Sequence, residues 1–192
     1  MNKTLDFIRA IEKLKTIERF NKTSNLERPE SDAEHIWHLV MMVYLLAELR
    51  ISLDKWKAVE IALVHDLVEV YAGDVNLWDD KKKTPEAKRE AEVKSAKKLF
   101  DLLPDDMGDR FYSLWEEYEA RITPEAKFVY ALDKLQPFVQ RVIARDNGWK
   151  EKRVDRKKLE DIKPQLVKDD PEMSKLWDEL TKEAIENKLL WE

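Results

Sequence analysis

The residues most able to do chemistry in this sequence are ionisable side chains set within apolar segments. His65, Asp66 and Glu69 interrupt the run A-L-V-H-D-L-V-E-V, which otherwise has the composition of a buried helix. Burying three such groups is costly unless they are paired, hydrogen-bonded or bound to a metal ion. On a helix Glu69 would lie one turn beyond the other two. A divalent cation would offset the cost, although a core histidine bonded to a backbone carbonyl would explain His65 alone.

Two other apolar segments contribute similar groups. His35 lies in the first turn of one, and Asp133 lies within F-V-Y-A-L-D-K-L. Pro137 removes the amide that would bond to the Asp133 carbonyl, so we expect a helix kink there. Two imidazoles and two carboxylates suit Mn, Co, Fe, Ni or Zn, and Mg is a further candidate. With three histidines in the chain and His38 expected at the surface or behind the ligands, we predict one divalent ion per chain.

The elements that must position these residues are helices. Apolar spacing is close to 3.6 residues, and the chain has only 3 glycines and 7 prolines, so we predict an all-α fold with one domain over residues 1–192. Ser31 and Glu34 form a capping box at a helix start, after a polar loop over 21–30. The expected helices cover about 4–19, 31–49, 54–72, 84–103, 105–120 and 123–148, with one or two more in 155–192.

Composition excludes several classes of protein. The chain has no cysteine, so thiol catalysis and thiolate metal sites are excluded. A net charge of -5 with both signs interspersed argues against a nucleic-acid binder. No segment approaches the ~20 apolar residues of a membrane helix, and the first residues lack the pattern of a signal peptide. We therefore expect a cytoplasmic protein that binds neither nucleic acid nor a membrane.

The order of these residues resembles a known family. His35, then His65-Asp66, then Asp133 is similar to the HD-domain superfamily of metal-dependent phosphohydrolases. Three segments, R-P-E-S-D-A-E-H at 28–35, H-D-L-V-E-V-Y-A-G-D at 65–74 and A-L-D-K-L-Q-P at 131–137, resemble its 5′-deoxynucleotidases, the YfbR-like group and its oxetanocin-type relatives. The resemblance covers about residues 1–150, and the C-terminal helices of 155–192 are expected to pack on that part.

The resemblance implies a helical HD-domain bundle that hydrolyses deoxyribonucleoside 5′-monophosphates. The four residues above would bind the metal ion, which can lower the pKa of bound water from ~16 to as little as ~7. Glu69 and Asp74 would flank this water as acid and base, and the sequence leaves open which is which. A homodimer is also implied, and several tryptophans, Trp149, Trp177 and Trp191, are candidates for its interface.

The resemblance also implies contacts with the nucleotide. Arg19 and Phe20 match an arginine–aromatic pair if one extra residue is allowed in the following loop. The family pattern has tryptophan where this chain has Phe20, which puts the preference for deoxyribose over ribose in doubt. Arg28 is a second candidate for contact with the phosphate.

Two alternative functions are compatible with the same residues. The substrate of the phosphohydrolase could be a triphosphate, a cyclic nucleotide or an alarmone. The chain could instead be a non-catalytic nucleotide-binding module that keeps a metal ion for stability. Glu69 and Asp74 argue against the module, because a metal ion held only for stability needs neither.

Overall fold

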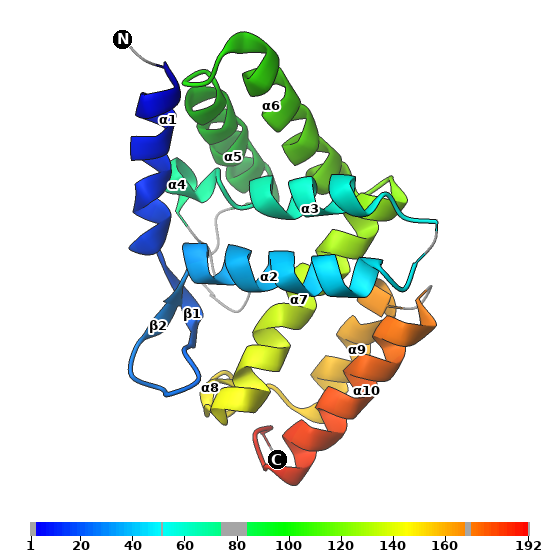
Figure 1. Ribbon diagram of the computed structural model, residues 1–192. Helices are drawn as coiled ribbons and strands as arrows, with labels where there is room; N and C mark the ends of the chain where they lie inside the picture. Colours follow the sequence, from blue (N-terminus) through cyan, green and yellow to red (C-terminus); the bar gives the residue numbers. More distant parts are fainter. Residues whose placement is uncertain (1–2, 51, 74–83, 168–169, 192) are drawn as a thin grey trace. The chain divides into compact units, whose positions relative to one another are not determined.

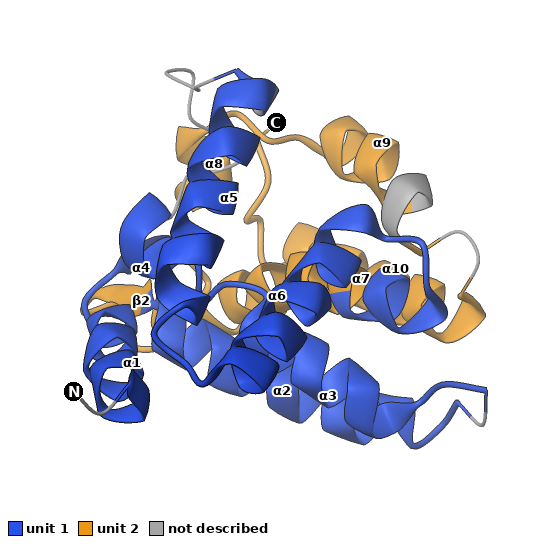
Figure 2. Ribbon diagram, turned by 90° about the horizontal axis from the view of Figure 1, so that it is seen from above, with its two compact units in different colours: residues 1–19, 31–129 blue, residues 20–30, 130–192 orange. Residues whose placement is uncertain are grey.

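The computed structural model describes residues 3–50, 52–73, 84–167 and 170–191. The chain divides into two compact units (Figure 2). The first unit comprises Met1–Arg19 and Ser31–Val129, and the second comprises Phe20–Glu30 and Tyr130–Glu192. Apart from one two-stranded sheet, the regular structure of the described residues is helical (Figure 1), so the predicted all-α fold is confirmed. The expectation of a single domain stays a prediction.

The first unit is built around the apolar helices α2 and α3. The helix α3 packs against α2 and α6, while α5 packs against α1, α4 and α6. Leu39 and Val43 of α2 and Ile61 of α3 are completely buried between these helices. The helical elements are α1 (Lys3–Ile11), the 3₁₀ helix η1 (Glu12–Lys15), α2 (Asp32–Ala47), α3 (Lys55–Val64), α4 (Glu69–Ala72), α5 (Pro85–Phe100) and α6 (Asp105–Ala120).

Helix starts follow the capping residues predicted from the sequence. The Ser31 hydroxyl accepts a hydrogen bond from the Glu34 amide at 3.3 Å, and the Glu34 carboxylate accepts one from the Ser31 amide at 2.9 Å. These two bonds form the capping box of α2. Asp54 accepts the Lys57 amide at 3.0 Å at the start of α3, and Thr84 caps α5. These side chains satisfy amides that have no partner within the helix.

The region before α2 differs from the prediction. The helix expected over 4–19 ends at Ile11. Two strands, β1 (Glu18–Lys22) and β2 (Pro29–Ser31), overlap the end of that expected helix and both ends of the loop expected over 21–30. The Asp32 amide donates to the Ile17 carbonyl at 3.0 Å. Backbone pairing with a segment about ten residues away therefore prevails over the local preference for helix.

The helix expected over 54–72 is also wrong, because it breaks at the His-Asp pair. α3 ends at Val64, residues 65–68 form a turn, and α4 begins at Glu69. Within the turn the backbone bonds tighten to three-residue spacing, from the Leu67 amide to the Val64 carbonyl at 3.1 Å and from the Glu69 amide to the Asp66 carbonyl at 3.1 Å. The Ser95 hydroxyl of α5 donates to the Val68 carbonyl.

The second unit contains the remaining helices. α7 (Pro124–Ala144) begins in the first unit and ends in the second, followed by α8 (Gly148–Glu151), α9 (Arg156–Val167) and α10 (Pro171–Glu186). The helix predicted to reach Gly148 ends at Ala144, where Arg145 adopts a φ of 54°. Phe138 of α7 makes edge-to-face contacts with Trp149 and Trp177, at centroid distances of 4.8 and 4.9 Å.

These two tryptophans are therefore core residues. Trp149 and Trp177 are buried, whereas Trp191 is 46% exposed. The expectation that Trp149 and Trp177 lie at an interface is wrong, because their rings fill the interior of the second unit. Among the described residues, no helix has the length and the apolar character needed to cross a membrane.

A buried polar network joins β1 to α7 within the second unit. Arg141 donates to Asp146 and to the Asn21 side chain, and Asn21 donates to the Pro137 carbonyl at 2.9 Å. Burial lowers the pKa of the Arg141 guanidinium, and the carboxylate of Asp146 opposes this effect. Pro137 thus lies inside α7 as predicted, and its carbonyl has a partner on the strand.

Candidate functional site

Three of the predicted metal ligands come together within the first unit. His35 lies in the first turn of α2, His65 follows the last residue of α3, and Asp66 is the second residue of the turn. Both imidazoles are almost completely buried, and the Asp66 side chain is 17% exposed. The pairing of α2 with α3 therefore brings residues 30 positions apart to one place.

The geometry of the three residues centres on one carboxylate oxygen. Asp66 Oδ2 lies 3.2 Å from His65 Nε2 and 3.6 Å from His35 Nε2. The centroids of the two imidazole rings are 5.6 Å apart. Each of these residues offers a ligand atom within 4.8 Å of the others. Two nitrogens and an oxygen in this arrangement can coordinate one divalent cation.

The hydrogen bond made by His65 orients its ring for metal coordination. Its Nδ1 lies 2.8 Å from the Ala62 carbonyl, which can only accept a hydrogen bond, so Nδ1 carries a proton and Nε2 is the nitrogen that a neutral ring would offer to a metal ion. The ring is also packed edge-to-face against Tyr118 at 5.0 Å. The sequence left a choice between a carbonyl-bonded core histidine and a ligand, and the geometry satisfies both descriptions.

The guanidinium of Arg19 lies beside the cluster of His35, His65 and Asp66. Arg19 Nη1 donates to Asp66 Oδ2 at 2.9 Å and to Asp32 Oδ1 at 3.1 Å. The Arg19 side chain is only 14% exposed, and Asp32 is completely buried. Sequence reasoning missed Asp32. The available signal was an acidic residue one helical turn before His35, but an acid at the start of a helix has an ordinary explanation in the helix dipole.

The two predicted acid–base residues differ in what the structure describes. Glu69 is buried at the start of α4, and its amide donates to the Asp66 carbonyl at 3.1 Å. The turn thus places Glu69 three residues after a candidate ligand. Asp74 lies outside the described residues.

The other predicted site residues belong to the second unit. Asp133 is a buried carboxylate on α7 and forms an ion pair with Lys134 at 2.7 Å. Phe20 lies beneath the cations of Arg141 and Lys152, at 5.1 and 5.4 Å from its ring centroid. Arg28 is exposed and donates to the Pro29 carbonyl at 3.0 Å.

Arg19 and Phe20 do not share surroundings although they are adjacent. Successive side chains of a strand point to opposite faces. The contacts of Arg19 are with Asp32 and Asp66 of the first unit, whereas those of Phe20 are with Arg141 and Lys152 of the second. The arginine–aromatic pair predicted from the sequence is therefore divided between the two faces of β1.

Comparison with known proteins identifies the family. The sequence matches the HD domain over residues 11–183. The chain belongs to the HD-domain family. This confirms the family predicted from the order of His35, His65-Asp66 and Asp133.

Several relatives of this HD-domain protein have been named or solved. It is 36% identical to human 5′-deoxynucleotidase HDDC2 over 137 residues, which cover 71% of this chain and 65% of the human protein. It is 33% identical to the HDDC2 protein of Dictyostelium discoideum over 147 residues, 73% of this chain and 76% of that protein. A crystal structure from Magnetospirillum magnetotacticum, described as a predicted metal-dependent phosphohydrolase, has a TM-score of 0.89 at 35% identity and covers 99% of this chain and 95% of that one.

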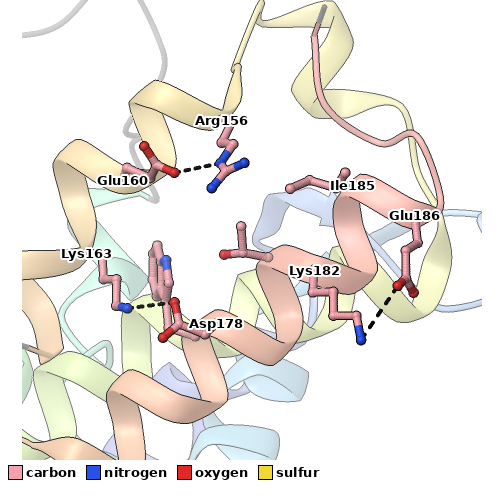
Figure 3. A pocket seen from close by; sticks show the side chains of 9 residues that line it. Arg156, Glu160, Lys163, Asp178, Lys182, Ile185 and Glu186 are labelled. Atoms are coloured by element: carbon pink, nitrogen blue, oxygen red, sulfur yellow. Dashed lines mark hydrogen bonds and ion pairs between the residues drawn. The ribbon is translucent and has the colours of Figure 1, made fainter.

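A separate cavity of the HD-domain protein has no comparable chemistry. It lies between α9 and α10 in the second unit and has a volume of about 390 Å³ (Figure 3). Its charged side chains pair with each other at 2.6, 2.6 and 3.9 Å. These pairs are Arg156–Glu160, Lys163–Asp178 and Lys182–Glu186. None of the predicted site residues that the structure describes lines this cavity.

Proposed function

We propose that this chain is a metal-dependent phosphomonoesterase that releases phosphate from deoxyribonucleoside or ribonucleoside 5′-monophosphates. The observation that carries the proposal is the convergence of His35, His65 and Asp66 beside the guanidinium of Arg19 in a chain of the HD-domain family. The relatives named 5′-deoxynucleotidase support the substrate class. A net charge of -5 argues against a nucleic acid as the substrate. The cytoplasmic location stays a prediction.

We assign one divalent ion per chain to His35, His65, Asp66 and Asp133. The first three form the described cluster, and the fourth is a buried carboxylate at the last position of the family motif. Two imidazoles and two carboxylates suit Mn, Co, Fe, Ni, Zn or Mg. A bound ion of this kind supplies a lowered pKa for coordinated water and polarisation of a phosphoryl oxygen.

Arg19 is the residue best supported for binding the substrate phosphate. Its guanidinium lies beside the clustered ligand candidates, where it donates to Asp66 at 2.9 Å and to Asp32 at 3.1 Å. A cation in this position would balance the charge of a phosphoryl group during transfer. Phe20 and Arg28 stay predictions, because their described contacts are with Arg141 and Lys152 and with the Pro29 carbonyl.

Glu69 and Asp74 are proposed as the acid–base pair. One would orient or deprotonate the attacking water, and the other would protonate the leaving 5′-oxygen. The burial of Glu69 one turn from Asp66 supports a place for it beside the reacting groups. The assignment of acid and base within the pair stays open.

The proposal is tested by phosphate release from a panel of deoxy- and ribonucleoside 5′-monophosphates. Metal-stripped protein is assayed with Mn, Co, Mg or Zn added singly. We expect release only with metal, and a loss of at least about 100-fold in Glu69→Gln, because a positioned acid or base contributes about 10²–10⁴-fold. The control is Glu90→Gln on the exposed surface of α5.

Two results would redirect the assignment. If the protein binds one metal ion but releases phosphate from none of the monophosphates, the nucleotidase proposal is wrong. Triphosphates, cyclic nucleotides and alarmones are then the next substrates to test. Metal binding with no turnover of any nucleotide would favour the non-catalytic module.

We further propose that the chain forms a homodimer through the outer face of α2 and α3. The inner side of α2 packs in the core, but its outer side is also apolar, and a helix that is apolar all round is normally buried. The outer face consists of Trp37, Met41, Tyr44, Leu45, Leu49 and Trp56. The rings of Tyr44 and Trp56 touch, with centroids 6.0 Å apart, which joins the two helices into one surface.

The size and charge of this outer face favour a second copy of the chain. Its two tryptophans, Trp37 and Trp56, are 68% and 64% exposed. The face presents on the order of 700 Å² of surface, which is more than the ~300–600 Å² of the largest apolar patch on a typical monomer. This area is close to the ~800 Å² that each partner buries in a standard interface. At its edge Lys55 is paired with Glu48. Because these charges are already balanced, the face can meet a copy of itself without repulsion.

A further inference from the structure

We propose that Asp32 is a positioning residue that holds Arg19 in place to bind the substrate phosphate. This inference rests on the proposed function, since it needs Arg19 to meet a phosphate. It assigns a role to a carboxylate that belongs neither to the proposed metal ligands nor to the proposed acid–base pair.

Asp32 is suited to be the permanent counterion of Arg19. It is completely buried at the first position of α2, and its Oδ1 accepts from Arg19 Nη1 at 3.1 Å. A buried carboxylate is stable only when it has a charged partner or accepts several hydrogen bonds. The start of the helix also favours the negative charge. Arg19 is therefore held by a carboxylate that solvent does not reach.

Asp66, the other carboxylate on Arg19, has a competing role. Its Oδ2 accepts from Arg19 at 2.9 Å and also faces both imidazoles. Donation of this oxygen to a cation would weaken its bond with Arg19. Asp32 is not part of the described metal-binding group, so its bond with Arg19 does not compete with metal binding. Asp32 can therefore keep the guanidinium in place whether or not Asp66 is coordinated to a metal ion.

Asp32 also links Arg19 to the metal ligands through the backbone. Its amide donates to the Ile17 carbonyl at 3.0 Å, two residues before Arg19, while His35 follows one turn later on α2. The strand that carries Arg19 and the helix that carries His35 are thus fixed to each other at one residue. A guanidinium fixed in this way loses less conformational entropy when it binds phosphate.

The test is a double-mutant cycle on the full chain. Asp32→Asn has the same shape but no charge, and Arg19→Met removes the guanidinium. The dissociation constant of deoxyadenosine 5′-monophosphate is measured on metal-stripped protein, and KM and kcat are measured with metal. We expect Asp32→Asn to weaken nucleotide binding about tenfold, the scale of one charge-assisted hydrogen bond, and to raise KM more than it lowers kcat.

In the Arg19→Met background Asp32→Asn should change the dissociation constant less than about twofold, since coupled residues are not additive. The control is Asp106→Asn, which removes an exposed acid from the first turn of α6 and should change neither constant. Asp32→Ser replaces Asp32→Asn if the latter does not fold, as judged by its melting temperature.

Additive effects, or a lower melting temperature with unchanged nucleotide affinity, would assign Asp32 a purely structural role and overturn the inference. A protein that shows the coupled loss of binding but hydrolyses no monophosphate would contradict the proposed function alone. A wild-type chain that binds no nucleotide overturns both.

Discussion

At the scale of single residues, Asp66 lies at the centre of the candidate site. One of its oxygens faces two imidazole nitrogens and the guanidinium of Arg19. Arg19 balances part of its charge, and the two imidazole nitrogens lie 3.2 and 3.6 Å from the same oxygen. A cation coordinated by these atoms would be released on unfolding, so its binding free energy would add to the stability of the folded chain. The arrangement therefore predicts that metal binding stabilises the fold.

Removal of the metal ion should lower the melting temperature. A ligand at 100 times its dissociation constant stabilises the folded state by about 2.7 kcal/mol, which for a chain of this size is about 5–10 °C. Calorimetry of metal-loaded and chelator-treated protein measures the shift. In Asp66→Asn the shift should vanish, whereas Asp109→Asn on the exposed surface of α6 should keep it. An equal shift in both variants would remove Asp66 from the ligand set.

His38 should make stability depend on pH. Partial burial lowers the pKa of the folded His38 side chain, whereas in the unfolded chain its pKa is about 6.5. Between these two values the unfolded state binds more protons, so the free energy of unfolding falls as the pH falls through this window. His38→Gln should show a shallower fall from pH 7 to 5 in thermal unfolding. Because His35 and His65 remain in both proteins, the difference isolates His38, and identical pH profiles would contradict the prediction.

At the scale of elements, the starts of helices follow directly from the sequence. The Ser31–Glu34 box and the caps at Asp54 and Thr84 are contacts over three residues, so the local sequence contains both partners. His35 and the His65-Asp66 pair could be predicted for a similar reason, since an ionisable residue within an apolar segment is visible in the sequence itself.

The elements that could not be predicted depend on residues far along the chain. β1 forms because β2 pairs with it, and both are too short for alternation to be recognised. The turn after α3 involves the Ser95 hydroxyl, 27 residues beyond the Val68 carbonyl to which it donates. Asp32 was missed because its partner, Arg19, lies on a strand that was expected to be helix. The role of Asp133 stays a prediction.

The contact between Ser95 and the turn leads to a prediction about this element. Ser95→Ala leaves the Val68 carbonyl without that donor, and a hydrogen bond of this kind contributes about 0.5–1.5 kcal/mol. We expect a melting temperature about 2–5 °C lower and several-fold weaker metal binding, because the turn carries His65 and Asp66. Thermal unfolding and metal titration measure the two effects. Ser113→Ala on the exposed surface of α6 is the control. Unchanged metal affinity in Ser95→Ala would mean that this hydrogen bond does not help to position His65 and Asp66.

At the scale of the whole molecule, the outer face of α2 and α3 links association to the candidate site. The same helix, α2, carries His35 at its start and the exposed side chains of Trp37, Met41 and Leu45 in the turns that follow. A second copy packed on this face would bury those side chains and restrain the helix that positions a ligand. Dimerisation is therefore expected to stabilise the region of the site.

Substitution at the centre of this face should produce a monomer. Leu45 is 61% exposed, and Leu45→Lys would place two unpaired charges within a two-fold interface, where like charges and desolvation oppose association. We expect half the molecular mass of the wild type by light scattering at the same concentration. The melting temperature of the monomer should become independent of protein concentration.

The matched control is Ile122→Lys, the same change of charge at a residue that is 74% exposed beyond the end of α6. It should leave the mass at the dimer value, which distinguishes loss of a specific contact from a general effect of added charge. Reduced metal affinity in the Leu45→Lys monomer would connect the interface with His35 through α2. A wild-type chain that is already monomeric at micromolar concentration would reject the homodimer.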